Sequence, residues 1–568
     1  MYQEIIKRAK SDFTETLKCN PIYAKTQEKI IELIDLYWVD KYKDSEFNEL
    51  GVKKAFYNII ENPTLVASKM VDIDTKDILV LAEDGQSFYP SWILSKELRQ
   101  WMKSKKNYDG KTFGQLLNQM TYALPKYGHL LVKKVGDSVS LVPLQNVLVK
   151  QNSENFMSSP YLIEEHEYSP EQFLKVGKER KWDNVKEIYE RFKEKDEIEI
   201  YEVSAHIDGE KENYFIIPEG VEDDLVLYKA KIDREGLYKE LKWDDIPGRA
   251  LGRGQVEKLF EAQIHTNRVE NYKTDGMQYT SKHVFQTRDD GIGRNMLTEV
   301  DNGEILTANS EITPVAMEEK NLSAYAQDEA RWGDLATKRT FAYDTISGER
   351  SPAGTPLGAT VLQAQMAGGF FDLKREDFGL FVRDIIADWI LPAFKKQSHK
   401  LHNILLGEFD EGELRKLKTT LVKHYTNKKI IDFIIKNKRI PTGEDAELLK
   451  TITEKTIEGQ KTLEIPADYY DDLKYKVQVI VTGESIDVGT KMQTLQTALQ
   501  MIGGNPTILQ DPNTRQYFSK LLELSGLSPT DFDTETPSQS PIAQIAGSVA
   551  KTPTQPMTAS KSPTEITI

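Results

Sequence analysis

Apolar and polar residues recur at two different spacings in the first half of the chain, and these spacings predict helices followed by strands. Residues 27–43 and 52–71 carry apolar side chains at helical intervals, and the second run is interrupted at Asn62-Pro63. From residue 110 to 149 the pattern changes from helix to strands, with a turn at 135–138. Further strand-like runs read PYLIEEHEY, EIEIYEVSA, NYFII and LVLYKAK. Residues 1–250 are therefore predicted to form an α+β domain.

Two long polar helices are predicted in the middle of the chain. The segment PGRALGRG at 247–254 breaks the pattern and opens a helical run over 255–282, which would be roughly 40 Å long. Its apolar stripe is thin, and a polar helix of this length needs neighbours to be stable. Turn clusters and short β-like runs follow, and a second helical run covers 318–347. We expect two antiparallel helices that carry a small β-rich tip.

Glycine and proline interrupt the chain again at 347–361, which reads SGERSPAGTPLGATV. A third helix is predicted over 359–397. We expect a kink at Gly368 and Gly369, because each glycine weakens a helix by about 1 kcal/mol relative to alanine. The second half of this helix is strongly amphipathic and is expected to lie in a core.

The last part of the chain is predicted to hold a second α+β piece, a helical region and a tail. Residues 400–485 contain one clear strand, LKYKVQVIVTG, and helical patterns continue to about residue 527. From residue 533 onward the chain is rich in Pro, Ser, Thr and Gln and contains no aromatic residue. Disorder is therefore predicted for this tail.

Composition narrows the classes of protein that this chain can be. Its 568 residues suggest about two to four domains. No stretch approaches the ~18 consecutive apolar residues of a membrane span, and the N-terminus lacks the apolar core of a secretion signal. The single cysteine, Cys19, excludes an internal disulfide framework and a Cys-based zinc site. A net charge of −15 argues against a tight, non-specific DNA binder, which needs clustered Lys and Arg.

The residue patterns of common enzymes are missing from the sequence. The loop at 347–361 lacks the Lys and the glycine spacing of a phosphate-binding loop, and residues 248–254 lack the dinucleotide-binding spacing. The histidines form no metal-binding motif, and acidic pairs such as Asp244-Asp245 lie in turn-like contexts typical of solvated surfaces. No nucleophile elbow is present. We therefore expect no catalytic residue, no metal and no cofactor.

The order of the predicted parts, together with three local patterns, resembles the portal (head–tail connector) proteins of tailed double-stranded DNA bacteriophages. The patterns are FGQLLNQMTYALPKYGHLLVKKVGDSVSLVPLQNVLV, GTPLGATVLQAQMAGGFFDLKREDFGLFVRDIIADWILP and YKVQVIVTGESIDVGTKMQTLQTALQM. The likeness spans roughly residues 50–527 and is to the podophage type, including the crAss-like group. In the second pattern, the run that starts at Gly358 lacks the acidic residue of the family's Thr-Ala-Thr-Glu-like start.

The resemblance implies a portal fold, of class α+β, in which each part of the chain has a role. The parts are the first part of the wing (1–253), stem helix 1 (254–282), the clip (283–317), stem helix 2 (318–347), the tunnel loop (348–358), a kinked wing helix (359–397), the second part of the wing (398–485), the helical crown (486–532) and the disordered tail (533–568). The resemblance also implies a ring of twelve copies at one capsid vertex, through which genomic DNA passes during packaging and ejection.

The implied partners are further copies of the chain, the major capsid protein, the large terminase subunit, a head–tail adaptor protein, and double-stranded DNA bound without sequence specificity. No membrane is implied. The candidate docking residues of the clip are Arg288, Asp289, Arg294, Glu299 and Glu304. The candidate channel residues of the tunnel loop are Arg350, Ser351, Gly354, Thr355 and Gly358. The resemblance implies a structural protein of the virion, made in the bacterial host cytoplasm, and not an enzyme.

In such a ring, a loop between two radial helices would point at the axis, and its Gly and Pro residues would let it deform as DNA passes. An acidic channel would leave DNA hydrated and moving, whereas fixed cations would hold it through counterion release. The stem helices are too polar for a core of their own, so they would pair charges between neighbouring copies. The candidates for this pairing are Glu257, Lys258, Glu261, Arg268, Glu270 and Lys273.

Two other classes of protein fit parts of the pattern. Another head–tail adaptor or tail ring subunit would also be a structural protein, but adaptors are usually shorter and lack two stem helices around a β tip. An enzyme would turn over substrate, so a phosphate-release assay on the purified protein separates it from a portal. In a portal system the motor activity would reside in the terminase.

Overall fold

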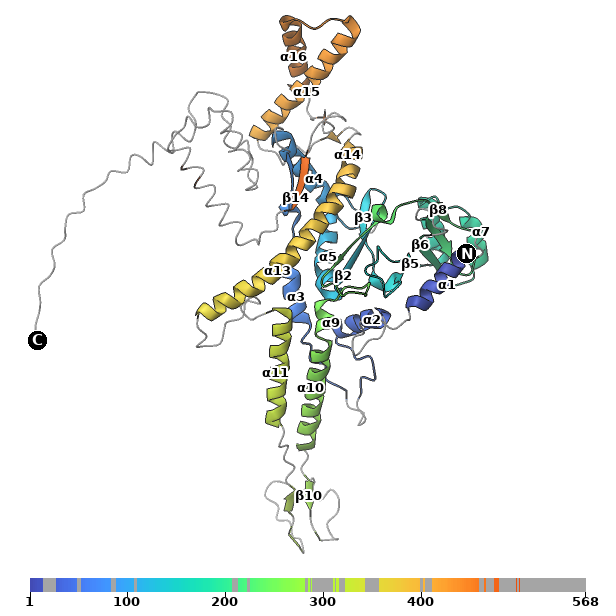
Figure 1. The fold of residues 1–568 in the computed structure, drawn as a ribbon, viewed down its shortest axis with the longest axis vertical. Helices are drawn as coiled ribbons and strands as arrows, with labels where there is room; N and C mark the ends of the chain where they lie inside the picture. The colour runs from blue at the N-terminus through green and yellow to red at the C-terminus, as the bar shows by residue number, and fades with distance from the viewer. Residues whose placement is uncertain are drawn as a thin grey trace, which may run out of the picture. The chain divides into compact units, whose positions relative to one another are not determined.

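The structure is a computed structural model. It describes residues 1–13, 27–47, 53–82, 88–106, 110–206, 213–221, 225–280, 284–286, 288, 310–311, 313–315, 322–342, 357–398, 402–403, 411–458, 464–465, 475–479, 497 and 500. The chain divides into two compact units: unit 1 holds Met1–Thr75 and Met102–Ile390, and unit 2 holds Lys76–Trp101 and Leu391–Ile568. Figure 1 labels many of the elements of both. Their mixture of helices and strands confirms the predicted α+β class.

The largest sheet of unit 1 is antiparallel, with the strand order β4-β5-β6-β7-β8. Its strands are Val147–Val149, Tyr161–Tyr168, Ile198–Ala205, Asn213–Pro218 and Tyr228–Ala230. Neighbouring residues along a strand point to opposite faces, and here both faces are buried. Helix α1 (Tyr2–Phe13) covers one face, and α6 (Pro170–Glu179) and α7 (Val185–Phe192) cover the other. The four strand-like runs predicted between 160 and 231 are confirmed in this sheet.

A second sheet of unit 1, β3-β2-β9, continues from helix α5. Helix α5 (Phe113–Tyr127) begins at a capping box and ends at Gly128, whose φ of 78° is left-handed. Strand β2 (His129–Val135) pairs with β3 (Ser138–Leu141) and with β9 (Tyr238–Lys242). The predicted change from a helix to a pair of strands is confirmed here.

The helix predicted over 52–71 is wrong in its first half. Helix α3 spans only Glu61–Met70, with Pro63 in its first turn, where a missing N–H is tolerated. Residues 53–60 form no helix, because their backbone groups bond to side chains of another helix, as described below. Helix α2 (Gln27–Trp38) is confirmed, although it ends before residue 43.

Two helices of unit 1 form a long antiparallel hairpin. Helix α9 (Gln255–Lys258) is short, and after one irregular residue α10 spans Phe260–Thr280, while α11 spans Leu322–Thr340. At 1.5 Å per residue α10 is about 30 Å long, shorter than expected. Strands β10 (Val284–Gln286) and β11 (Thr313–Val315) pair antiparallel beyond the far ends of the helices (Figure 1). The predicted order of helix, β pair and helix is confirmed, with shorter helices.

Helix α13 spans Leu357–Ile385 and passes through Gly368 and Gly369 without interruption. The helical hydrogen-bond pattern changes later, in a π-helical segment at Ile386–Ile390. The irregular turn of this helix is therefore not at the two glycines, where the sequence predicted it. The apolar residues of the second half are buried as predicted: Phe378, Phe381, Val382, Ile385, Ile386, Trp389 and Ile390.

Unit 2 combines a stretch from early in the chain with the C-terminal part. Strand β1 (Ile78–Ala82) pairs antiparallel with β14 (Tyr475–Val479), which lies in the strand predicted at 473–483. The other elements are α4 (Phe88–Ser104), α14 (Leu391–Ser398), β12 (His402–Asn403), α15 (Glu411–Asn437), α16 (Gly443–Glu458) and β13 (Glu464–Ile465). The sequence placed residues 76–101 with the first α+β part, because periodicity does not show which distant strand completes a sheet. Within the described residues, none of the helices combines the length and the apolar character needed to cross a bilayer.

Candidate functional site

Helix α10 carries three amide side chains at four-residue intervals, here termed the amide ladder: Gln263, Asn267 and Asn271. Positions four apart share one face of a helix. Their side-chain oxygens accept hydrogen bonds from three alternate backbone N–H groups: Ile59 at 3.0 Å, Tyr57 at 3.0 Å and Ala55 at 2.9 Å. The Gln263 amide also donates to the Tyr57 carbonyl at 2.6 Å and to the Asn267 side chain at 2.9 Å.

The amide ladder explains both the polar character of α10 and the missing first half of the predicted helix at 52–71. A backbone segment needs partners for its N–H and C=O groups, and a neighbouring strand usually supplies them. Here side-chain amides supply them instead. Gln263 and Asn267 are buried, so part of the polar stripe of α10 is an internal contact and not a solvated face.

Asn267→Ala is expected to release residues 55–59 locally. The Tyr57 N–H would lose its acceptor, which destabilises the contact by about 1 kcal/mol because this group is only partly buried. Hydrogen exchange should show faster exchange at Tyr57 than in the wild type. Arg268→Ala, at the exposed neighbouring position, is the control and should leave the exchange unchanged. Equal protection at Tyr57 in both variants would contradict the role of the ladder.

The two helices of the hairpin contact each other through aromatic and charged side chains. His265 of α10 stacks on Trp332 of α11, with ring centroids 4.6 Å apart and an angle of 1° between the planes. Farther along, Lys273 Nζ lies 3.1 Å from Glu329 Oε2. These contacts hold the antiparallel pair in register without a large apolar core.

Five of the six charged residues expected to pair between neighbouring copies have partners within the chain. Lys258 Nζ lies 2.5 Å from Asp244, and Glu261 lies 3.5 Å from Arg339. Lys273 contacts Glu270 of its own helix and Glu329 of α11, and Glu257 is buried in an ion pair with Arg249. The candidates with an internal partner are Glu257, Lys258, Glu261, Glu270 and Lys273.

The base of the hairpin is fixed by close backbone contact among three glycines, here termed the glycine junction: Gly128, Gly252 and Gly254. A Cβ atom at Gly128 would lie 2.0 Å from the Gly254 nitrogen, and one at Gly252 would lie 2.1 Å from the Gly128 oxygen. The Trp243 N–H donates to the same Gly128 carbonyl at 2.9 Å. The segment PGRALGRG, expected as a break that opens a helix, is therefore also the loop that anchors the hairpin to the end of α5.

A buried ion pair reinforces this anchor. Arg249 Nη1 and Nη2 donate to the two carboxylate oxygens of Glu257 at 2.7 and 2.6 Å. The two side chains are 1% and 3% exposed, so the pair is shielded from solvent. Arg249 also donates to the Gly252 carbonyl at 3.3 Å. A bidentate pair of this kind holds α9 in a defined orientation on the glycine junction.

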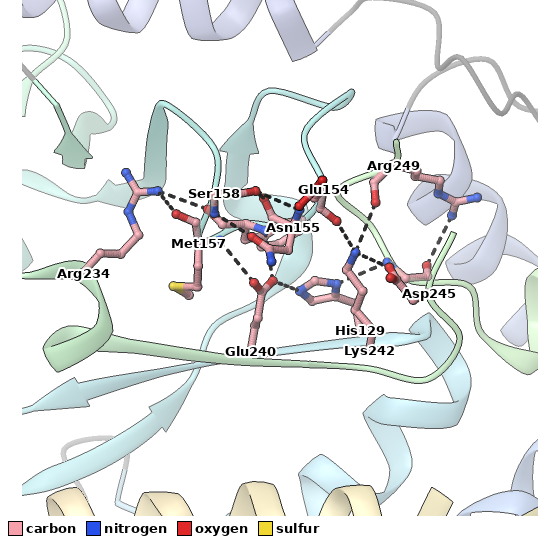
Figure 2. Close-up of polar contacts among 12 residues, drawn as sticks. His129, Glu154, Asn155, Met157, Ser158, Arg234, Glu240, Lys242, Asp245 and Arg249 are labelled. Atoms are coloured by element: carbon pink, nitrogen blue, oxygen red, sulfur yellow. Dashed lines mark hydrogen bonds and ion pairs between the residues drawn. The ribbon is translucent and has the colours of Figure 1, made fainter. Parts of the chain in front are cut away.

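His129, the first residue of β2, is buried beside Glu240 of β9 (Figure 2). The Gly252 N–H donates to His129 Nδ1 at 3.2 Å, so the neutral ring carries its proton on Nε2, which lies 3.2 Å from Glu240 Oε2. Burial lowers the pKa of His129 and favours this neutral form. Glu240 also accepts from the backbone N–H groups of Phe156 and Met157 at 3.0 and 3.2 Å. The pair therefore ties β2, β9 and the 156–157 loop to the junction.

A cavity of about 500 Å³ opens beside this pair, and charged groups line it. Figure 2 shows Lys242 there: its ammonium donates to the carbonyls of Glu154 and Arg249 and lies 2.6 Å from Asp245. On the other side of the loop, Arg234 of the short helix α8 (Arg234–Leu237) donates to four backbone carbonyls. These groups bond to one another and to the backbone, which is an arrangement that holds loops and not one that presents a reactive group.

Charged and tyrosine side chains link the two larger sheets of unit 1 in a cluster here termed the charge network: Lys133, Glu164, His166, Arg180, Glu202, Tyr214 and Tyr238. Lys133 Nζ donates to Glu164 at 2.7 Å and also to Glu202. Arg180 donates to Glu202 at 2.8 Å, and the two tyrosine hydroxyls donate to the carboxylates. Burial is the largest single influence and would raise the pKa of both glutamates. Lys133 and His166, joined at Glu202 by Arg180, together outweigh it and hold both pKa values below the usual range.

Glu164, His166 and Glu202 bring ligand atoms within 4.8 Å of one another, as a metal site would. The same carboxylates already accept from Lys133, and a metal-bound histidine must be unprotonated. Burial alone would lower the pKa of His166, but its contacts with Glu164 and Glu202 outweigh burial and raise the pKa to about 9. His166 is therefore protonated at neutral pH, and the cluster fits balanced ion pairs and not a metal ion.

The charge network is expected to lose strength at high pH through His166. Its ring nitrogen faces Glu202 and Glu164 at 3.3 and 3.5 Å, Arg180 and Lys133 share those carboxylates, and Tyr168 stacks on the ring. The folded pKa of about 9 lies above the unfolded value of about 6.5, so stabilisation of about 3 kcal/mol is complete below pH 6.5 and is lost as pH rises through 9.

Urea unfolding of wild type and His166→Gln at several pH values measures this effect. The difference in unfolding free energy between them should be largest near pH 6 and should shrink towards pH 10. A difference that stays constant over this range would contradict the protonated state of His166.

The residues proposed from the portal resemblance lie mostly outside the described part of the chain. Outside it are the tunnel-loop residues Arg350, Ser351, Gly354 and Thr355 and the clip residues Asp289, Arg294, Glu299 and Glu304. Arg288 is described and is exposed, two residues after β10. Gly358 lies in the first turn of α13, so this helix begins inside the predicted loop 348–358. Apart from residues 497 and 500, the predicted crown and tail are also outside the described residues.

The sequence analysis did not predict the amide ladder, the glycine junction or the charge network. The spacing of Gln263, Asn267 and Asn271 was a visible signal for the amide ladder. The glycine junction and the charge network join residues more than 60 positions apart, and no local pattern reports such pairings. No protein-family model matches the chain, and no curated protein matches it.

Proposed function

We propose that the chain is the portal protein of a tailed double-stranded DNA bacteriophage. Copies of it form a ring at one vertex of the capsid, twelvefold as in the family that the sequence resembles. Genomic DNA passes through this ring during packaging and ejection. The wing contacts the major capsid protein, and the clip binds the terminase large subunit first and a head–tail adaptor later.

The polar α10–α11 hairpin with its two-stranded end is the observation that carries the proposal. Its distal half exposes apolar side chains, with Tyr272 54% and Met277 49% exposed. Such side chains on a polar helix pair are buried when hairpins of several copies pack side by side. Heterologous contacts that repeat by a closing rotation generate a ring.

The charge of the chain supports passage of DNA and not capture. The net charge is −15, and the exposed positions of α13 include Asp372, Glu376 and Asp377. A protein that holds DNA neutralises phosphates with Lys and Arg and gains affinity by counterion release. An acidic ring lacks that gain, so the duplex remains hydrated and mobile inside it.

Imaging of negatively stained, purified full-length protein tests the proposal. Rings with a central hole are expected; single chains at every concentration, or tight retention of duplex DNA at physiological salt, would reject it. A phosphate-release assay on the same material should show no ATP turnover, and turnover would favour an enzyme instead. Binding of purified terminase to the ring separates a portal from another head–tail ring protein.

Arg350→Ala is expected to leave ring assembly intact and to change DNA packaging or retention modestly. Arg350 is the one basic residue of the 348–358 loop, so a ring would place one cation per copy near its axis. Removing it subtracts weak contacts to phosphate without adding strain. Packaging assays with the variant measure the effect, and complete loss of ring formation would count against the assignment of this loop.

A further inference from the structure

The α15–α16 hairpin of unit 2 leaves several large apolar side chains in solvent. Between the two helices, Val422, Thr426, Thr453 and Ile457 are buried. The exposed apolar residues of the hairpin are Ile431, Ile434, Ile435, Ile440, Leu448 and Ile452. Single exposed apolar residues are common on protein surfaces, but six on one small hairpin mark a contact surface.

Four of the six exposed residues form one apolar pair on each helix. Ile431 and Ile435 of α15 are four residues apart, and so are Leu448 and Ile452 of α16, so each pair shares a helix face. Ile435 is 68% and Leu448 64% exposed. We term these the α15 face, defined by Ile431 and Ile435, and the α16 face, defined by Leu448 and Ile452.

The two helices carry opposite charge. Helix α15 contains seven basic and three acidic residues, whereas α16 contains five acidic and two basic residues. Two α15 helices brought together would repel each other, and so would two α16 helices. An α15 helix and an α16 helix attract. Charge therefore favours contact between unlike helices of different copies.

We propose that the α15 face of one copy binds the α16 face of the next copy, so that the hairpins form a continuous belt around the ring. This inference rests on the ring of the proposed function. It adds which faces of neighbouring copies meet and which residues form the contact. The contact is heterologous, and every copy uses both faces once, as ring closure requires. Apolar burial supplies the attraction, and the opposite charges exclude the symmetric pairings.

Cysteine cross-linking in assembled full-length protein tests the belt. The chain has one native cysteine, so Cys19→Ser provides a cysteine-free background. Ile435→Cys and Leu448→Cys are placed on separate chains, mixed and co-assembled, and also combined on one chain. A short bismaleimide then links cysteines that lie near each other. The matched control replaces Leu448→Cys with Lys450→Cys, because Lys450 is exposed but two residues away, on another side of α16.

The belt predicts cross-linked dimers in the mixture, none with either single variant, and a ladder of multimers when both cysteines are on one chain. The Lys450→Cys combination should give much less product. Cross-linking of one single variant with itself would show a symmetric contact and overturn the proposal. Only intrachain product would show that no neighbouring copy lies against these faces, which also overturns it.

The same experiment separates this proposal from the proposed function. Rings in the microscope without the series of cross-linked multimers would reject the belt but not the ring. The α15–α16 hairpin would then contact a different protein. Cross-linked multimers without closed rings would support the contact between copies and reject the portal assignment. Uncross-linked single chains at every concentration would reject both.

Discussion

Gly128→Ala is expected to destabilise unit 1 by more than about 4 kcal/mol, a loss that few single substitutions reach. The new Cβ would lie 2.0 Å from the Gly254 nitrogen and 2.3 Å from the Arg253 carbonyl carbon. Both are backbone atoms, and the loop that carries them is held by the buried pair of Arg249 and Glu257. The clash therefore cannot be relieved by turning a side chain. A φ of 78° adds further strain for any residue with a Cβ.

Urea unfolding followed by tryptophan fluorescence measures this loss, with Gly136→Ala as the matched control. Gly136 also has a left-handed φ, 61°, but no atom lies within 4 Å of its would-be Cβ. Its loss should be only about 1–2 kcal/mol, which is the conformational part alone. Gly333→Ala, in open space on α11, should stabilise the helix by about 0.5–1 kcal/mol. Equal losses for Gly128→Ala and Gly136→Ala would show that crowding at the junction is not the cause.

Lys133→Met is expected to destabilise unit 1 by about 3–5 kcal/mol at neutral pH, because it leaves two buried carboxylates without the cation between them. Glu164 and Glu202 are 3% and 1% exposed, so water cannot replace the ammonium. Arg180 and His166 still contact Glu202, whereas among the described residues Glu164 keeps His166 as its one cationic neighbour. In the variant the pKa of Glu164 rises, so the loss should shrink as pH falls towards 4 and the carboxyl becomes protonated.

Unfolding free energies of three further variants check this account. Lys134→Met changes the next residue of β2, which points to the other side of the strand and is only half-buried, so it should change stability by no more than about 0.5 kcal/mol. The double variant Lys133→Met, Glu164→Gln should regain much of the loss, and Glu164→Gln alone completes the cycle. Additive losses in this cycle would mean that Lys133 and Glu164 do not interact in the folded protein.

Much of the secondary structure could be predicted from the sequence, because alternation and helical spacing report burial within one element. Strands β5 to β8, the β2–β3 pair and β14 lie where the patterns placed them. Helix α13 also follows its pattern, and its apolar second half is buried. The errors occur where another element intervenes: residues 53–60 form no helix because the amide ladder bonds their backbone.

The candidate site was predictable only in outline. The order of α10, the β10–β11 pair and α11 followed from turn signals and periodicity, and it led to the portal resemblance. The partners of the charged residues on α9 and α10 did not follow from the sequence. Glu261 and Lys258 were read as contacts between copies, and only the structure shows that Arg339 and Asp244 of the same chain lie beside them.

The sequence by itself determined the α+β class, the two long polar helices around a β pair, and the acidic charge that argues against tight DNA binding. The first two properties depend on residues close together in the chain, and the net charge is a sum over all its residues. Only the tertiary structure decided that β1 pairs with β14, that Gly128 meets the distant Gly252 and Gly254, and that Lys133 lies between two glutamates. Such contacts depend on which distant elements pack together after folding, and the spacing of residues within one element does not predict this.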